Sequence, residues 1–405
     1  MNRPVILTMA DYYLPGYKGG GPIRTLENME NRVGEEFHFR IATRNRDFGE
    51  REPYDVTPHE WMPLGQSDIC YLKSGRAGRK KLLDLLREPT YDVLYLNSFF
   101  SPAFSIEPLL HRRLGRIPSR PVVLAPRGEL SEGALSLKAT KKRLFLNAAK
   151  SIGLHRGVVW QASSEHEERE IRGLFGPEAE IVVAPDLAPR FDPASQDISW
   201  PEKPAGTLKI VFLSRICQKK NLQFVLEMLR DVRSTTELSI VGPIEDEPYW
   251  NDCRQVMDSL PANVSVEHLG SIEPCEVAEM MRRHDLFALP TLGENFGHVI
   301  LEAVSAGCPA LLSDRTPWTD LEANSAGWTI PLDQPGRFTE VIEQCALKNA
   351  REYNELRSST LAYAANYLAS DGETVEQNRA LFLRCLARGK GSSPSFTAPP
   401  LRRSA

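Results

Sequence analysis

The sequence has 405 residues, of which 41% are hydrophobic and 25% are charged, and its formal net charge is −4. A chain of this length fits two domains with separate cores, and this balance is that of a globular protein rather than of a disordered or membrane-embedded one. No nucleic acid is expected among its partners.

Three further features predict a cytoplasmic location. The apolar run near the N-terminus is only about six residues long, which is too short for the core of a signal peptide. No stretch of about 18 apolar residues is present, so no transmembrane helix is expected. The seven cysteines are odd in number and show no CxxC spacing, which favours free thiols in a reducing compartment over a disulfide framework or a zinc site.

Short β-rich runs alternate with helix-length segments along the chain. In the first half the runs are VILTM (5–9), FRIAT (39–43), DVLYL (92–96), PVVLAP (121–126) and VVWQAS (158–163). In the second half they are KIVFLS (209–214), LSIVG (238–242), VSVEHLG (264–270), LFALPT (286–291) and PALLSD (309–314). This alternation is typical of βαβ units, and the nearly continuous apolar strands indicate parallel sheets covered on both faces.

The expected fold is therefore α/β, with two Rossmann-like doubly wound parallel-sheet domains that face a cleft, and with a C-terminal closing helix. The ligand site is expected in that cleft, because small-molecule sites favour domain interfaces. The expected boundaries are 1–190 for the first domain, 191–206 for a linker rich in Pro, Ser and Asp, 207–370 for the second domain, 371–389 for the closing helix and 390–405 for a disordered tail.

A glycine-rich loop, YYLPGYKGGGPIRT (12–25), stands between the first strand and a helix. Because Gly20 and Gly21 have no Cβ, they can let backbone N–H groups approach a ligand at the helix N-terminus. The loop does not fit GxGxxG, which disfavours a nicotinamide cofactor. A plain tight turn is the alternative interpretation.

The segment 137–157 is rich in Lys and Arg around apolar side chains, among them Leu144, Phe145 and Ile152. This pattern suits an amphipathic helix that touches an anionic membrane or substrate, and it would allow a peripheral position on the inner face of the membrane. The exposed basic face of an ordinary domain is the alternative, because runs of charge are usually solvated.

The first strand of the second half ends in FLSRICQKKNL (212–222), which directs Arg215, Lys219 and Lys220 toward the cleft. Cations at this position can bind a diphosphate, since arginine offers a bidentate fork and lysine a point charge. Asn221 is expected to cap the helix that follows. A solvated basic turn is the alternative.

Two glutamates, Glu294 and Glu302, stand eight positions apart in ENFGHVILE. If Asn295 caps a helix over 296–306, Glu294 lies in the loop that enters the cleft, and Glu302 lies about 9 Å along the helix axis. The free amide groups at the helix start would supply positive potential for a phosphate. These amide groups belong to Phe296, Gly297 and His298.

A nucleotide sugar has the elongated shape that this arrangement requires. Its sugar would lie near Glu294, its diphosphate at the helix start and at Arg215 and Lys220, and its ribose hydroxyls at Glu302. A charge exposed on one helix face is the alternative for Glu302, although its sequence neighbours are apolar.

Four motifs in this order resemble those of the family 4 retaining glycosyltransferases, which have the GT-B fold. SRICQKKNL resembles the Arg-and-Lys diphosphate clamp of that family, and ENFGHVILE resembles its E-x7-E motif. GGGPIRT and APRGEL (125–130) resemble its first-domain loops. The resemblance extends from about Ala10 to Leu386 and therefore covers most of the chain.

The resemblance implies that a sugar moves from a nucleoside diphosphate to an acceptor hydroxyl with retained anomeric configuration, without a divalent metal or another cofactor. Glu294 would contact hydroxyls of the donor sugar, Glu302 would contact the ribose, and Arg215 with Lys220 would bind the leaving diphosphate. The sequence contains no DxD triplet that could hold a cation, although EDE (245–247) is acidic.

The sequence departs from this family at two places. Many members have a histidine after the strand that corresponds to DVLYL, where this chain reads NSFFSPAF (97–104), so no general base can be named. PDLAP (185–189) replaces the usual Pro-Asn-Gly turn at the end of the first domain. The candidate acceptor-side residues are Asn97, Ser98, Arg127 and Glu129.

The function expected from the sequence is that of a glycosyltransferase of the hexosyltransferase type, acting in surface polysaccharide biosynthesis. Its acceptor would be a glycan or a lipid-linked saccharide. Two alternatives remain open. One is a nucleotide-sugar epimerase or hydrolase on the same fold, and the other is a non-catalytic nucleotide-sugar-binding protein.

Overall fold

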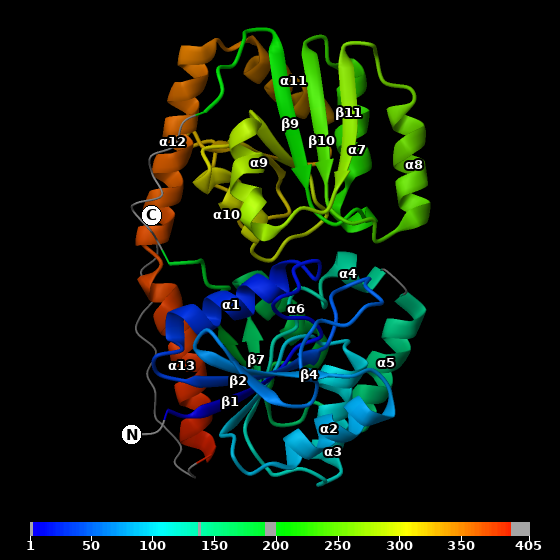
Figure 1. The fold of residues 1–405 in the computed structure, drawn as a ribbon, viewed down its shortest axis with the longest axis vertical. Coiled ribbons are helices and arrows are strands. Elements are labelled where there is room, and N and C mark those ends of the chain that lie inside the picture. Colours follow the sequence, from blue (N-terminus) through cyan, green and yellow to red (C-terminus); the bar gives the residue numbers. More distant parts are fainter. Residues whose placement is uncertain (1–2, 137–138, 191–199, 390–405) are drawn as a thin grey trace.

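The structure is a computed structural model that describes residues 3–136, 139–190 and 200–389. Two α/β domains lie one above the other along the longest axis of the molecule (Figure 1). Most of the predicted linker and the whole of the predicted tail, 390–405, lie outside the described residues. No helix within the described ranges is both long and apolar enough to cross a bilayer. All seven cysteines are free thiols, as predicted.

The first domain contains an eight-stranded sheet of order β3-β4-β2-β1-β5-β6-β7-β8. Its strands are β1 (Val5–Met9), β2 (His38–Arg44), β3 (Trp61–Leu64), β4 (Ser67–Leu72), β5 (Val93–Leu96), β6 (Val122–Leu124), β7 (Val158–Ala162) and β8 (Glu180–Val183). All neighbours pair in parallel except β3 and β4, so the predicted all-parallel sheet is wrong at that edge. Pro63 lies in β3, where an edge strand tolerates the missing N–H group.

Helices cover both faces of the first sheet, and each face has its own hydrophobic cluster. The helices of this domain are α1 (Gly21–Val33), α2 (Arg76–Arg87), the π-helix η1 (Pro102–Ile106), α3 (Glu107–Arg113), α4 (Glu132–Ser136), α5 (Ala139–Ser151) and α6 (Glu165–Phe175). One cluster joins α2, α3, α5 and α6 to the sheet, and the other joins α1 to the opposite face. This is the doubly wound arrangement that the sequence predicts.

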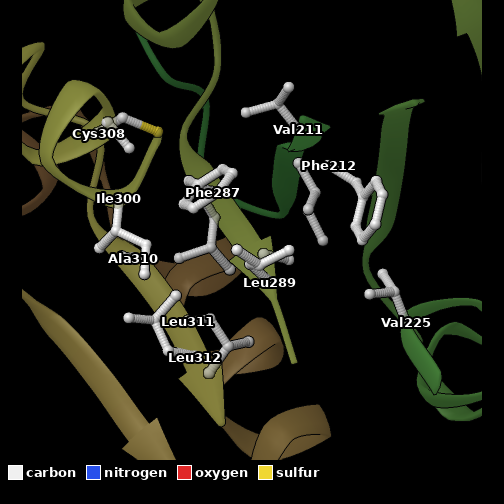
Figure 2. Packing of buried hydrophobic residues seen from close by; sticks show 14 of the residues in the cluster. Val211, Phe212, Val225, Phe287, Leu289, Ile300, Cys308, Ala310, Leu311 and Leu312 are labelled. Atoms are coloured by element: carbon white, nitrogen blue, oxygen red, sulfur yellow. The ribbon is translucent and has the colours of Figure 1, made fainter. Parts of the chain in front are cut away.

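The second domain contains a six-stranded parallel sheet of order β11-β10-β9-β12-β13-β14. Its strands are β9 (Thr207–Leu213), β10 (Thr235–Val241), β11 (Val264–Gly270), β12 (Leu286–Leu289), β13 (Ala310–Ser313) and β14 (Gly327–Ile330). The central strands β12 and β13 are buried on both faces, whereas the edge strand β11 alternates between half-buried and exposed residues. Figure 2 shows Phe212, Phe287 and Leu311 from three neighbouring strands packed near Val225 of α7 (Leu222–Met228) and Ile300 of α10 (His298–Ser305).

The remaining helices follow the second sheet and lead back to the first domain. They are the 3-10 helices η3 (Gln218–Lys220), η4 (Leu229–Asp231) and η5 (Pro274–Glu276), and α7 (Leu222–Met228), α8 (Glu247–Met257), α9 (Val277–Arg283), α10 (His298–Ser305), α11 (Pro335–Leu347), α12 (Ala350–Ala369) and α13 (Gly372–Gly389). In Figure 1, α12 and α13 run along one side of both domains. α12 packs against α10, whereas Phe382 of α13 contacts Phe37 and Tyr95 in the first domain. The predicted closing helix is α13.

Candidate functional site

A cavity of about 470 Å³ lies between the two domains, a volume within the usual range for small-molecule sites. The carboxyl ends of strands in both sheets lead into the loops that line it, which is where open α/β sheets bind ligands. Most of the site residues predicted from the sequence line the cavity. They are Gly20, Gly21, Asn97, Arg127, Glu129, Arg215, Lys220, Glu294, Gly297, His298 and Glu302. Ser98, Asn295 and Phe296 do not line it.

Arg215 follows β9 and forms an ion pair with Glu245, with 2.7 Å between Nη1 and Oε2. The backbone positions this partner, because the N–H group of Glu245 donates to the carbonyl oxygen of Ile216 at 3.1 Å. On its other side Arg215 reaches the first domain, where its guanidinium lies 5.8 Å from the ring centroid of Phe48. Arg215 therefore contacts residues of both domains.

Lys220 and Glu294 form an ion pair in which the ammonium group donates to Oε2. Burial alone would raise the pKa of the Glu294 carboxyl, but the charges of Lys220, Lys219 and Arg215 together lower it. Burial lowers the pKa of the Lys219 amino group, against the charge of Glu294. Three cations and one carboxylate thus gather beside the carboxyl end of β9.

Asn221 is the N-cap residue of α7, as predicted, but its side chain makes no capping hydrogen bond. It adopts a left-handed conformation with φ 61°, which asparagine tolerates better than most residues. Its side-chain amide instead donates to the carbonyl oxygen of Pro290 at 2.9 Å. This hydrogen bond connects the segment of Lys219 and Lys220 to the segment that follows β12.

α10 begins at His298, two residues later than predicted, because Gly297 is the cap residue and has φ 78°. A Cβ at Gly297 would lie 2.6 Å from Cδ1 of Ile300, so only glycine fits there without a shift. The predicted set of free amide groups is therefore wrong for Phe296, which precedes the helix. The N–H group of Ile300 already donates to the carbonyl oxygen of Gly297 at 2.8 Å, so the open N-terminus of α10 consists of the amide groups of His298 and Val299.

Asn295 connects the two domains instead of capping α10. Its Nδ2 donates to Oε1 of the buried Glu167 at 3.3 Å, and the N–H group of Gly128 donates to the same oxygen at 2.6 Å. Phe296 is buried, and its carbonyl oxygen accepts a 2.5 Å hydrogen bond from Nε1 of Trp318. Neither residue lines the cavity.

Glu302 and His298 face the first domain across the cavity. Oε1 of Glu302 lies 3.8 Å from Nε of Arg24. Burial raises the pKa of Glu302, and the charge of Arg24 opposes that shift. Nε2 of His298 lies 2.9 Å from Oγ1 of Thr25, and burial lowers the pKa of this imidazole to about 4. His298 is consequently neutral at physiological pH.

Glu129 is fully engaged by first-domain donors. Its carboxylate accepts hydrogen bonds from Oγ of Ser98 at 2.9 Å and from the N–H groups of Phe99 at 2.6 Å and Phe100 at 2.8 Å. Burial raises the pKa of this carboxyl, and the hydrogen bonds oppose the shift. The Ser98 hydroxyl therefore donates to Glu129, and Ser98 itself does not line the cavity.

Arg127 fixes Asn97 at the first-domain wall. Its Nη2 donates to Oδ1 of Asn97 at 2.9 Å, and its Nη1 forms an ion pair with Asp186. Asn97 is 6% exposed. Its Nδ2 has no hydrogen-bond partner in the part of the chain that the structure describes.

Several cavity residues were not predicted as site residues, among them Lys18, Arg24 and Lys142. Lys18 and Arg24 flank the three glycines, so their position beside the loop was a usable signal. The acidic EDE run does not form a metal site: Glu245 pairs with Arg215, and Oδ1 of Asp246 caps α8. Within the described ranges, no three His, Cys, Asp or Glu side chains group closely enough to hold a metal ion.

Residues 196–363 match the family model of glycosyl transferases group 1. Phosphatidyl-myo-inositol mannosyltransferase of Mycolicibacterium smegmatis is 24% identical over 323 residues, which cover 77% of this chain and 76% of that protein. Alpha-monoglucosyldiacylglycerol synthase of Streptococcus pneumoniae is 31% identical over 106 residues, 26% of this chain and 24% of that protein. The chain spans about a quarter to about a half of the length of three curated relatives that it matches, for example 52% of D-inositol 3-phosphate glycosyltransferase of Jonesia denitrificans.

Two solved structures share the whole fold. Anabaena HepE, solved in complex with UDP and glucose, superposes with a TM-score of 0.65 at 16% identity and covers 94% of this chain and 99% of that one. Sucrose-phosphate synthase from Thermosynechococcus elongatus has a TM-score of 0.67 at 16% identity, with 96% and 100% covered. The predicted pair of parallel-sheet domains in the GT-B arrangement is thereby confirmed.

Proposed function

Because this chain carries a glycosyl transferases group 1 domain on a GT-B fold, we propose that it is a retaining glycosyltransferase. It transfers a sugar from a nucleoside-diphosphate donor to a hydroxyl group of a glycan or lipid-linked acceptor in surface polysaccharide biosynthesis. The observation that carries the proposal is the cluster of Arg215, Lys219 and Lys220 beside Glu294, at the strand ends that line the cavity.

The donor is a nucleotide sugar whose diphosphate lies against Arg215 and Lys220. Both cations line the cavity, and the amide groups at the start of α10 add positive potential nearby. HepE was solved with UDP and with UDP-glucose, which makes a UDP sugar the first donor to test. The arginine and lysine cations would supply the charge that a divalent metal supplies elsewhere, so transfer should proceed in the presence of EDTA.

The two glutamates take different parts of the donor. Glu294, which lies at the diphosphate cations and is ionised at neutral pH because its pKa is lowered, accepts hydrogen bonds from the sugar hydroxyls. Glu302 lies further along α10 and faces the ribose. Arg215 and Lys220 stabilise the charge that develops on the diphosphate as the glycosidic bond breaks, and such electrostatic stabilisation is commonly the largest catalytic contribution.

A basic and apolar surface on the first domain suits a peripheral position on an anionic membrane. Segment 108–121 has four Arg and segment 139–157 has five Lys or Arg, and neither has an Asp or Glu. The two segments meet where Nε of Arg113 donates to the carbonyl oxygen of Ile152 at 3.0 Å. Large apolar side chains are exposed there, with Leu144 73% exposed and Ile152 47% exposed. The predicted Lys138 lies outside the described residues.

The membrane proposal is tested by flotation with phosphatidylglycerol vesicles. Changing both Leu144 and Ile152 to Asp should abolish flotation, because apolar insertion and the positive potential are both reduced. Leu347→Asp is the control, since Leu347 is a 68% exposed leucine on the second domain. Equal flotation of wild type and the double variant contradicts this part of the proposal.

The enzymatic proposal is tested with the purified protein, first by calorimetry with UDP, GDP and ADP and then by mass spectrometry with their sugars and a panel of glycan and lipid-linked acceptors. Transfer to an acceptor supports it. Consumption of the donor without an acceptor indicates a hydrolase or epimerase. Binding of nucleotide without any turnover indicates a non-catalytic protein, and the absence of heat with all three nucleotides refutes the donor site.

A further inference from the structure

A network of hydrogen-bonded, buried polar side chains leads from the C-terminal helix through the core of the first domain to the cavity. Its five members come from four separate parts of the sequence. They are Asn97 after β5, Arg127 after β6, Tyr95 in β5, Gln161 in β7 and Asn378 in α13. Tyr95, Gln161 and Asn378 are at most 1% exposed. Because unpaired polar groups are unfavourable in a core, the orientation of each member is set by its partners.

The first member of this polar network is Asn378 of α13, whose carboxamide has one possible orientation. Its Nδ2 donates to the carbonyl oxygens of Pro185 at 2.8 Å and Thr374 at 2.9 Å, so Oδ1 faces Gln161. Nε2 of Gln161 donates to that oxygen at 3.2 Å and to the carbonyl oxygen of Ala184 at 2.9 Å. Oε1 of Gln161 therefore faces away from α13, toward Tyr95 of β5.

The polar network continues to the cavity wall, and each side chain again has its donor and acceptor roles set by its neighbour. Tyr95 donates its hydroxyl to Oε1 of Gln161 at 2.6 Å and accepts from Nη2 of Arg127. Nη2 of Arg127 also donates to Oδ1 of Asn97 at 2.9 Å. A guanidinium has no acceptor atom, so Asn97 must present its oxygen to Arg127 and turn its Nδ2 away.

The Nδ2 group of Asn97 is the last group of this polar network. It is buried and has no hydrogen-bond partner among the described residues, and Asn97 lines the cavity. A buried donor without a partner is unfavourable, so an oxygen atom of a bound ligand at this point would be favoured. The side chain can only donate there, because its oxygen is already held by Arg127.

We propose that Asn97 binds an oxygen atom of the substrate through Nδ2, and that Asn378, which does not line the cavity, is a positioning residue that acts on Asn97 through Gln161, Tyr95 and Arg127. This inference rests on the proposed function for the nature of the substrate. The oxygen belongs either to the acceptor or to the sugar being transferred. α12 and α13 lie on different domains, so Asn378 also connects the cavity to the helix pair that spans them.

The positioning role is tested by NMR on protein labelled with 15N at asparagine. The side-chain signal of Asn97 is identified by its loss in Asn97→Ser. We expect it to move in Asn378→Leu and in Tyr95→Phe, a change that removes the hydroxyl but keeps the ring beside Phe382. Cys385→Ala is the matched control, because Cys385 is buried on α13 outside the polar network. An unchanged Asn97 signal in folded Tyr95→Phe overturns the proposal.

The substrate contact is tested by kinetics with UDP-glucose, or with the donor found in the screen. Asn97→Ser and Asn378→Leu should each lower kcat/KM about tenfold, and the double variant should fall no further than the stronger single variant. Additive losses indicate a merely structural role for Asn378 and overturn the proposal. A parallel loss in donor hydrolysis without acceptor assigns the oxygen to the sugar, and a loss in transfer alone assigns it to the acceptor. If wild type neither binds nor turns over any donor, the proposed function fails, whereas the NMR result still decides the positioning role.

Discussion

Lys220 and Glu294 form an ion pair at the cavity wall although they lie 74 positions apart in the chain. The carboxylate belongs to the loop before α10, and the ammonium group belongs to the short helix after β9. A diphosphate bound to Lys220 would share this cation with Glu294. The ion pair therefore couples Lys220, which we assign to the diphosphate, with Glu294, which we assign to the sugar.

Glu294→Gln should abolish transfer and yet strengthen the binding of UDP. The amide keeps the shape of the side chain but removes one negative charge beside Lys220, so UDP affinity should rise about fivefold, or about 1 kcal/mol. Calorimetry with UDP and a transfer assay measure the two effects. Glu279→Gln, on the exposed surface of α9, should change neither. Weaker UDP binding by the Glu294 variant would contradict the assignment.

Arg215→Ala should weaken UDP binding by about 1.5 to 3 kcal/mol, because a charge-assisted hydrogen bond to the diphosphate is lost. Arg215→Lys should recover only part of this loss, since lysine cannot replace a bidentate fork. The control is Arg283→Ala, which removes a 69% exposed arginine of α9 that is paired with Glu279. Equal dissociation constants for UDP in wild type and both Arg215 variants would exclude this arginine from the diphosphate site.

His298 should make the free energy of unfolding depend on pH. Its pKa is about 6.5 in the unfolded chain and is lowered by burial to about 4 in the folded protein. Between these values the unfolded state binds a proton that the folded state does not. Stability is therefore complete above pH 6.5 and declines as the pH falls toward 4, by up to about 3 kcal/mol from this one group.

Urea denaturation from pH 7 to pH 4.5 checks this expectation. His298→Gln should flatten the profile. Burial also lowers the pKa of His155 to about 4, so changing His155 together with His298 should flatten the profile further. A profile that keeps the wild-type slope after His298→Gln would show that this imidazole is not held neutral.

The cavity cations and glutamates could be predicted because each follows a recognisable strand or stands in a helix-periodic run. Arg215 and Lys220 come after β9, and strand ends in both sheets lead to the cavity. Glu302 is marked by its apolar neighbours in α10. In these cases the local sequence determines the position, and the topology of parallel sheets determines the direction.

The errors occurred where a contact distant in sequence decides between local options. Asn295 and Gly297 are both residue types that can cap a helix. Gly297 is the cap residue here, whereas the side chain of Asn295 donates a hydrogen bond to Glu167 of the other domain. The hydrogen-bond partner of Ser98, Glu129, likewise lies 31 positions away and could not be predicted locally. Asn378 gave no local signal at all, since its partner Gln161 is 217 positions away.

Gly128→Ala should impair the docking of the two domains. Gly128 has φ 73°, and a Cβ there would lie 2.5 Å from Oδ1 of Asn295. The positive φ costs about 1 kcal/mol for an L-residue, and the clash pushes the loop of Asn295 away from the first domain. We expect a lower free energy of unfolding, a larger radius of gyration by small-angle X-ray scattering, and slower turnover.

Adding Asn295→Ala to this variant separates the two causes. Removal of the carboxamide relieves the clash but leaves the strained backbone, so the radius of gyration should return to the wild-type value while stability recovers only in part. Gly173→Ala is the matched control, because it lies in α6 with nothing within 4 Å of the added Cβ, and alanine is favoured over glycine in helices. If Gly128→Ala leaves both stability and radius unchanged, the contact between Gly128 and Asn295 does not hold the domains together.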